Sequence, residues 1–194
     1  MTRSATVERN TKETQISLTL NLDGTGRANV ATGFGFLDHM IGSLVFHGRL
    51  DLDLSVQGDG HIDDHHTVED TALALGAAID QALGDRAGIA RFGHAYAPLD
   101  EALARAVIDL SGRPWPAVDL GLKREMLGTV ACENLSHFFN SLALAGRLCL
   151  HVDVLKGDND HHRAEAAFKA VALALRAAVR ADGTSVPSTK GTLV

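Results

Sequence analysis

Hydrophobic and polar residues alternate along several stretches of the chain, a period that is typical of half-buried strands. In the clearest stretch, every second residue from Ile16 to Leu22 is isoleucine or leucine. The strands expected from this alternation and from the intervening turn residues are residues 7–22, 27–32, 50–56, 94–110, 117–122 and 148–154.

Between these stretches the apolar residues recur with the spacing of amphipathic helices. Glycines follow several of these stretches, as is common at helix ends. The expected helices are residues 37–46, 65–83, a segment around 134–139 that ends near Gly146, and 161–180. The tail, residues 182–194, contains glycine and proline and is expected to be irregular.

The second half of the chain repeats the first. An arginine at position 49 or 147 opens an alternating apolar stretch, and the two copies are 98 residues apart. His39 lies nine residues before a glycine, and so does His137. Such a repeat predicts two half-repeats, residues 1–88 and 89–194, within one compact domain. We expect an α+β fold in which each half is a mainly antiparallel sheet with two helices packed on one face.

Composition excludes several classes of protein. Hydrophobic residues make up 45% of the 194 residues and charged residues 22%, as in ordinary globular proteins. A net charge of -6 argues against non-specific nucleic-acid binding. No apolar run reaches the roughly 18 residues of a membrane span, and the first residues lack the apolar core of a signal peptide. Cys132 and Cys149 have no metal-type spacing and are expected to be reduced, buried thiols of a cytoplasmic protein.

Two histidine doublets stand at the starts of the two longest expected helices. His65-His66 is followed by Glu69, and His161-His162 by Glu165. The first histidine and the glutamate of each copy are four residues apart and therefore share a helix face. The second histidine is rotated by about 100° around the helix axis. Each helix start can therefore serve two different metal ions.

His39 and His137 lie in register upstream of the doublets, which completes two matched sets of candidate metal ligands. Imidazole together with carboxylate suits manganese, iron or zinc. Our hypothesis assigns one ion to His39, His66, His161 and Glu165, and the other to His65, Glu69, His137 and His162. We expect the complete sites to take ligands from two subunits. Three aspartates beside the doublets are expected to orient the imidazoles: Asp63, Asp64 and Asp160.

Simpler explanations apply to some of these residues. An isolated histidine is usually a surface or satisfied core residue, which is our interpretation of His47, His61, His94 and His151. One doublet alone is also compatible with a chance arrangement at a helix start. Two doublets in register, each with an upstream histidine, favour the metal interpretation.

A second group of residues has the chemistry of an anion site. Its members lie near turns or element ends and are Arg91, Arg113, Lys169, Ser188 and Lys190. The stretch from Pro187 to Gly191 offers backbone N–H groups, a hydroxyl and an ammonium, which suit phosphate. Spacing alone nevertheless favours a solvated tail. Glu13, by itself, is only a charge at a strand edge.

Taken together, these motifs resemble those of the imidazoleglycerol-phosphate dehydratase family. The resemblance covers nearly the whole chain. It rests on Arg9-x-Thr11-x-Glu13-Thr14, Gly35-Phe36-Leu37-Asp38-His39-Met40, Asp63-Asp64-His65-His66-Thr67-Val68-Glu69-Asp70, Ser136-His137-Phe138-Phe139, Asn159-Asp160-His161-His162-Arg163-Ala164-Glu165-Ala166-Ala167-Phe168-Lys169 and Pro187-Ser188-Thr189-Lys190-Gly191.

The resemblance implies a function, a cofactor and an assembly. It implies a hydro-lyase of histidine biosynthesis that converts D-erythro-imidazole-glycerol phosphate to imidazole-acetol phosphate. Two Mn²⁺ ions per active site would favour the substrate imidazolate, from which a diazafulvene forms. The family implies a homo-oligomer of twenty-four subunits with active sites at subunit interfaces. Each half-repeat would have a fold like the second domain of ribosomal protein S5.

The resemblance also implies roles for individual residues. Glu165 and Glu13 become candidates for proton transfer, with Glu69 mainly a metal ligand. The basic and hydroxylic residues become phosphate and substrate contacts, which overrides the solvated interpretation of the tail. One departure lies at Gly42-Ser43, where family members often have Asp-Gln and the glutamine contacts substrate. Ser43 is shorter and would need a water molecule to reach the same place.

Two competing functions use the same residues. A dinuclear hydrolase acting on a phosphate ester needs two metals and a basic pocket as well, but it releases inorganic phosphate. A metal-storage or metal-sensing protein needs the histidines, but it has no use for Lys190, Arg91 or Glu13.

Overall fold

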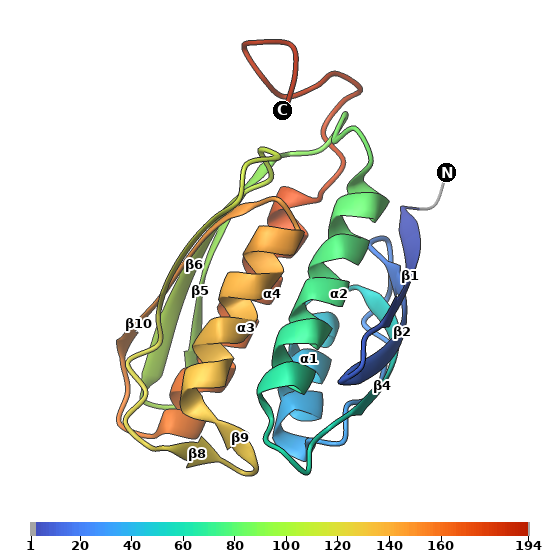
Figure 1. Cartoon of the computed structure of the whole chain (residues 1–194). Coiled ribbons are helices and arrows are strands. Elements are labelled where there is room, and N and C mark those ends of the chain that lie inside the picture. Colours follow the sequence, from blue (N-terminus) through green and yellow to red (C-terminus); the bar gives the residue numbers. More distant parts are fainter. Residues whose placement is uncertain (1–2, 194) are drawn as a thin grey trace.

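The computed structural model describes residues 3–193, which form two four-stranded sheets with four helices between them and one short two-stranded ribbon (Figure 1). The first sheet has the order β1-β2-β4-β3. Its strands are β1 (Ser4–Asn10), β2 (Thr14–Asn21), β3 (Ala28–Ala31) and β4 (Asp51–Gly58). All neighbours are antiparallel except β3 and β4, which are parallel.

The second sheet repeats this arrangement with the order β5-β6-β10-β7. Its strands are β5 (Phe92–Leu99), β6 (Ala102–Asp109), β7 (Trp115–Asp119) and β10 (Cys149–Lys156). Again only the last pair, β10 and β7, is parallel. A short ribbon of β8 (Met126–Leu127) and β9 (Val130–Ala131), which the sequence did not predict, precedes the third helix.

The helices form the middle of the molecule (Figure 1). They are α1 (Gly35–Gly48), α2 (His65–Leu83), α3 (Cys132–Ala145) and α4 (Asp160–Ala178). Helices α1 and α2 pack on the first sheet, α3 and α4 on the second, and the pairs meet as α2 with α3 and α1 with α4. Three buried rings fill part of the second half, with Phe139 and Phe168 4.5 Å apart between centroids and Phe138 beside both. The expected α+β fold, with two helices on one face of each mainly antiparallel sheet, is confirmed.

Two of the expected strands are each divided into a hairpin. Residues 7–22 form β1 and β2, and residues 94–110 form β5 and β6. In the first turn, the Thr11 hydroxyl accepts hydrogen bonds from the backbone N–H groups of Glu13 and Thr14. In the second turn, Asp100 adopts a left-handed conformation with φ of 47°. Neither turn contains glycine or proline, so the usual sequence signal of a hairpin is absent.

The exact boundary at residue 88 stays a prediction. The tail of the second half-repeat returns to this connection, where the backbone N–H of Gly88 donates to Ser185 O and that of Asp182 donates to Gly88 O. Of the two thiols, Cys132 is buried and Cys149 is only half-buried, because Cys149 begins β10 at the edge of the core. Burial raises the pKa of both thiols. Within residues 3–193, none of the helices has the length and hydropathy needed to cross a membrane.

Candidate metal centres and active site

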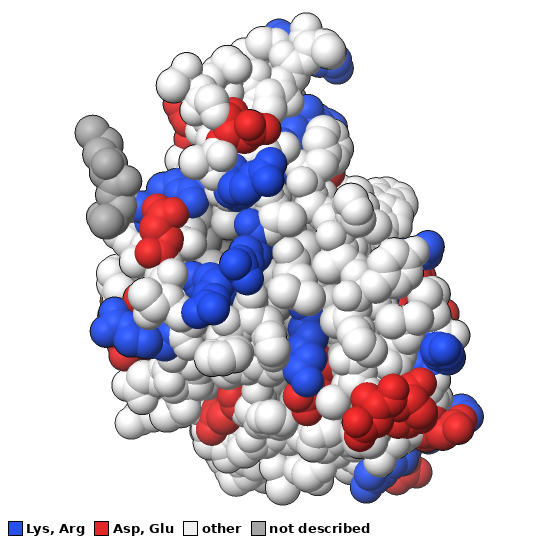
Figure 2. Space-filling view, turned by 180° about the vertical axis from the view of Figure 1, so that it is seen from behind, with Lys and Arg blue, Asp and Glu red and all other residues white. Residues whose placement is uncertain are grey.

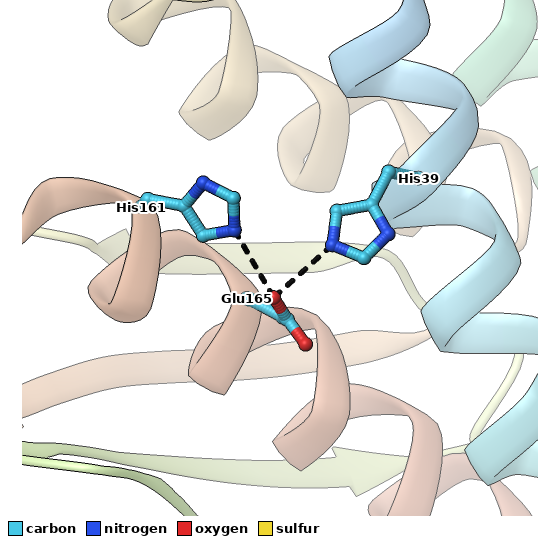
Figure 3. Close-up of side chains that lie close together, drawn as sticks. All are labelled: His39, His161 and Glu165. Carbon is cyan, nitrogen blue, oxygen red and sulfur yellow. Dashed lines mark hydrogen bonds and ion pairs between the residues drawn. The ribbon is translucent and has the colours of Figure 1, made fainter.

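The first group of candidate ligands lies where the start of α1 meets the start of α4 (Figure 3). His39 projects from α1, and His161 and Glu165 project from one face of α4. The Nε2 atoms of both histidines lie 3.2 Å from the same carboxylate oxygen, Glu165 Oε2. The side chain of Asn159 caps α4 by accepting from the His161 backbone N–H, which fixes the start of this helix.

The second group is built in the same way where α2 meets α3. His137 Nε2 lies 3.1 Å from Glu69 Oε1, and His65 Nε2 lies 3.8 Å from Glu69 Oε2. The rings of His65 and His137 are stacked with centroids 5.0 Å apart. His65 Nδ1 donates to Asn134 Oδ1 at 3.0 Å, so its Nε2 faces the carboxylate with an available lone pair.

The remaining two histidines point away from these groups, as the 100° rotation on the helix predicts. His66 Nδ1 donates to Asp59 Oδ2 at 2.9 Å, and its Nε2 lies 3.8 Å from Glu13 Oε1. His162 Nδ1 donates to Glu101 Oε2 at 2.7 Å. The structure therefore brings together three of the four ligands assigned to each ion and leaves His66 and His162 outside.

The aspartates beside the doublets do not contact imidazoles, contrary to the expectation from sequence. Asp64 accepts from the Ala131 backbone N–H at 2.9 Å. Asp160 accepts from the backbone N–H groups of Lys123 and Arg124 at 2.9 and 2.7 Å, and Asp63 accepts from the His65 backbone N–H at 2.9 Å. They anchor neighbouring loops and helix starts because their short side chains reach nearby main-chain donors first.

The imidazoles are instead held by residues that sequence reasoning missed: Asn134, Asp59 and Glu101. Glu101 lies in the turn between β5 and β6, far from His162 in sequence. Its second oxygen, Oε1, accepts from the backbone N–H groups of Asp158 and Asn159 at 3.1 and 2.9 Å. One signal in the sequence was available, since Glu101 stands directly before β6 as Glu13 stands directly before β2.

Local hydrogen bonds lower the pKa values of two carboxyl groups and raise those of the two outer histidines. Burial raises the pKa of Glu165, but hydrogen bonds from Lys169 and His39 outweigh this and hold it below its ordinary value. The hydrogen bond from His162 and those from nearby backbone N–H groups lower the pKa of Glu101 to about 2. The pKa values of His66 and His162 are raised, chiefly by their hydrogen bonds to Asp59 and Glu101.

The candidate phosphate contacts are spread over two regions. Lys169 Nζ lies 2.7 Å from Glu165 Oε1, beside the first metal group. Arg91 pairs with Asp109 at 2.7 Å and donates to Pro187 O in the tail. Arg113 is exposed in the turn after β6. The backbone N–H of Lys190 donates to the Ser188 hydroxyl, and that of Gly191 to Ser188 O, which closes a tight turn.

The tail lies at the opposite end of α4 from the first metal group (Figure 1). Helix α4 has 19 residues and is therefore roughly 28 Å long. Ser188 and Lys190 follow the end of this helix, whereas His161 stands at its start. The chain does not bring its own tail to its own metal ligands.

Two further sequence candidates have different environments. The Glu13 side chain is 53% exposed, and its Oε1 atom lies 3.8 Å from Nε2 of His66. Ser43 is buried in α1, and its hydroxyl has no hydrogen-bond partner among the described residues. Because Ser43 is buried, the substrate contact considered for it has no direct support in this geometry.

The donor atoms of both groups fit a divalent transition metal. In each group, two imidazole nitrogens and one carboxylate oxygen lie within 4.8 Å of one another. Mixed nitrogen and oxygen donors suit manganese, iron or zinc. The hydrogen bond from His65 Nδ1 to Asn134 further supports this use of the Nε2 atoms.

Comparison with known proteins gives the same family over most of the chain. Residues 32–175 match the family model of imidazoleglycerol-phosphate dehydratase. A protein of that name from Zymomonas mobilis is 54% identical over 196 residues, which cover all of both chains. Another from Phytophthora nicotianae is 59% identical over 98% of this chain, which spans only 42% of that longer relative.

Solved structures agree with the sequence comparison. The crystal structure of imidazoleglycerol-phosphate dehydratase from Staphylococcus aureus superposes with a TM-score of 0.83 and 35% identity, covering 92% of this chain and 99% of that one. The fold and the sequence therefore agree, and the chain belongs to the imidazoleglycerol-phosphate dehydratase family of hydro-lyases.

Proposed function

We propose that this protein is a manganese-dependent enzyme that removes water from D-erythro-imidazole-glycerol phosphate and produces imidazole-acetol phosphate in histidine biosynthesis. The observation that carries the proposal is the pair of matched groups, His39–His161–Glu165 and His65–Glu69–His137. An imidazole ring has two nitrogens, and two separate metal groups offer one site for each. Family membership supports the same reaction.

Each proposed site holds one Mn²⁺ ion, so that two serve one active site. His66 would join His39, His161 and Glu165, and His162 would join His65, Glu69 and His137. Bound manganese would act as a Lewis acid that favours the deprotonated substrate ring. Because Asp59 and Glu101 accept from the Nδ1 atoms of His66 and His162, the Nε2 atom of each ring points outward.

The proton transfers are assigned to Glu165 and Glu13. Expulsion of the hydroxyl beside the ring would give a diazafulvene, whose adjacent C–H is acidic; a carboxylate then removes that proton and the enol relaxes to the ketone. Glu13 is suited to this step because it is half exposed beside His66 and has no basic partner within hydrogen-bonding distance among the described residues. Glu165 is held in its carboxylate form by Lys169.

The substrate phosphate is assigned to Arg91, Arg113, Lys169, Ser188 and Lys190. Because the tail lies at the far end of α4, we assign Ser188 and Lys190 to an active site that includes another copy of the chain. The same reasoning applies to the outward histidines. We therefore propose a homo-oligomer, a 24-mer by family resemblance, with active sites between subunits. The free thiols suit a reducing compartment, and a cytoplasmic location stays our prediction.

The central experiment combines anaerobic purification, metal analysis and an assay for imidazole-acetol phosphate. With manganese supplied, we expect the ketone product and no release of inorganic phosphate. Phosphate release would instead identify the hydrolase. Absence of any product from the manganese-loaded protein would contradict the proposal.

A second variant separates the enzyme from a metal-storage protein. Lys190→Ala is expected to keep the metal content of the wild type and to lose most of its turnover, because it removes one cation from the substrate phosphate. Unchanged turnover would contradict the assignment of the tail. Lys12→Ala, which alters an exposed lysine outside the proposed phosphate set, is the matched control.

A further inference from the structure

A basic hollow lies at the ends of α1 and α4 that are opposite the metal ligands. It has a volume of about 590 Å³. Figure 2 shows basic side chains in a row across this face of the molecule. The arginines that line the hollow are Arg3, Arg49, Arg176 and Arg180.

Only one of these arginines is paired with a carboxylate among the described residues. Arg3 Nε donates to Asp23 Oδ2 at 3.1 Å. Arg49 donates to a backbone carbonyl, Thr25 O, at 3.2 Å. Within residues 3–193, neither Arg176 nor Arg180 makes a side-chain hydrogen bond or ion pair. The hollow is therefore bordered by the Arg3–Asp23 pair and by three arginines without a carboxylate partner among the described residues, although the whole chain is acidic, with a net charge of -6.

The ends of α2 and α3 are equivalent by the duplication to the ends of α4 and α1, and there the arginine charge is neutralised. Arg147 corresponds to Arg49, which stands 98 residues earlier, and each adopts a left-handed conformation just after a helix. Asp80 in α2 corresponds to Arg176 in α4, 96 residues later. Asp80 lies 3.6 Å from Arg147 and also pairs with Arg86. At the ends of α1 and α4, Arg176 therefore occupies the position that the carboxylate of Asp80 occupies at the ends of α2 and α3.

Stabilisation of helix ends does not account for this cluster. A cation in the last turn interacts favourably with the carbonyl end of a helix. Arg176 alone would supply this interaction at the end of α4, and α2 forms without any basic residue in its last turn. Arg49 and Arg180 add like charge at the same place, which is unfavourable unless an anion is present.

We propose that this hollow binds a phosphate monoester through Arg49, Arg176 and Arg180. Guanidinium groups match the geometry of phosphate oxygens and bind them in pairs of hydrogen bonds. Leu22 and Leu173 line the same hollow and offer an apolar surface for the organic part of the ligand. None of these residues belongs to the metal groups or to the proposed substrate-phosphate contacts, so the site goes beyond the proposed dehydratase activity.

The test is isothermal titration of phenyl phosphate into the assembled, manganese-loaded protein. The wild type is expected to bind at two kinds of site, the active site and the hollow. Arg176→Asp recreates the arrangement of the other half, and it should weaken binding at the hollow about tenfold or more. Arg180→Gln, which keeps the side-chain bulk, should weaken it about threefold. Lys156→Asp makes the same charge change as Arg176→Asp at the end of β10 and should leave both sites unchanged.

Turnover separates this site from the active site. Arg176→Asp should keep the KM and kcat of the wild type within about twofold, because Arg176 belongs neither to the metal groups nor to the proposed substrate-phosphate contacts. If its titration matched that of the wild type, or if its KM for substrate rose tenfold, the hollow would not be an independent anion site. A carboxylate from a second copy filling the hollow in a crystal structure of the assembly would also overturn the proposal.

Discussion

The two histidines of each doublet have different neighbours although they are adjacent in sequence. His161 faces Glu165 and His39, whereas His162 is held by Glu101 in a distant turn. Glu101 and Glu13 occupy matching turns, yet only Glu101 is within hydrogen-bonding distance of its histidine. In the first half Asp59 performs this task, which leaves Glu13 available. The duplication has thus given one glutamate an orienting role and left the other for proton transfer in our proposal.

A prediction at this scale concerns Glu101→Gln. Glutamine has one acceptor oxygen, so it cannot bind both the loop at Asp158 and Nδ1 of His162. We expect the manganese affinity of the site served by His162 to fall about tenfold, as measured by titration of the metal-free protein. The control is Glu8→Gln, which alters a carboxylate whose one hydrogen bond among the described residues comes from the Ser17 hydroxyl at 2.7 Å. Equal manganese affinity in the two variants would show that Glu101 does not orient a ligand.

A second residue-scale prediction concerns acid stability. Hydrogen bonds from Arg27 and from the backbone N–H groups of Thr25 and Arg27 hold the pKa of Asp51 well below its ordinary value. A carboxylate with a lowered pKa stabilises the fold above its unfolded pKa of about 3.9, and this contribution is lost as the pH falls below that value. Asp51→Asn should therefore lower the free energy of unfolding by about 1 kcal/mol at pH 7. The difference from the wild type should shrink below about pH 4 in denaturant titrations; a constant difference would contradict this assignment.

At the scale of elements, the position of the metal groups depends on how the two helix pairs meet. Each group takes ligands from two helices, α1 with α4 or α2 with α3. Gly76 sits at the second contact, where a Cβ atom would lie 2.6 Å from Leu142 O and 2.8 Å from Gly146 N. These are backbone atoms, which cannot move aside cheaply. The close approach of α2 and α3 therefore requires glycine at this point.

Gly76→Ala is expected to destabilise the protein by about 2 kcal/mol, because the overlap outweighs the gain in helix propensity. Denaturant unfolding measures the change. Gly42→Ala in α1 is the control, since nothing lies within 4 Å of a Cβ atom there. It should be neutral or stabilising by up to about 1 kcal/mol. Similar effects of the two substitutions would mean that the α2–α3 contact adjusts without cost.

At the scale of the whole molecule, neither metal group is complete within one chain under our assignment. The first group lacks His66 and the second lacks His162, and both of these rings point outward. If a second copy completes the first group, one copy contributes its ligands from the second doublet and the other copy contributes His66 from the first doublet. This arrangement makes a distinct prediction for mixed assemblies.

His39→Ala and His66→Ala should each abolish turnover as pure assemblies. When the two variants are dissociated, mixed in equal amounts and reassembled, about one quarter of the sites should be intact, because random pairing brings the unaltered His39 of one copy to the unaltered His66 of another. Turnover should recover to about that fraction. Mixing His39→Ala with His161→Ala, which alter the same group, is the control and should recover none. No recovery in the first mixture would contradict the shared site.

The sequence by itself determined the periodic part of this protein. Alternation and helical spacing identified the strands of the two large sheets and the four described helices, and the register of the two doublets revealed the duplication. It also separated the first histidine of each doublet from the second, because that separation follows from helix geometry alone. The hairpin turns at Thr11 and Asp100 were missed, since they contain no glycine or proline.

Only the tertiary structure decided which distant residues meet. It placed His39 beside Glu165 and His137 beside Glu69, and it gave Glu101 rather than Asp160 the task of holding His162. It also showed that Arg49 and Arg176 border one hollow whose lining carboxylate, Asp23, is paired with Arg3. The physical reason is the same in each case: local periodicity reports which face of an element a residue occupies, but contacts across elements depend on how those faces pack.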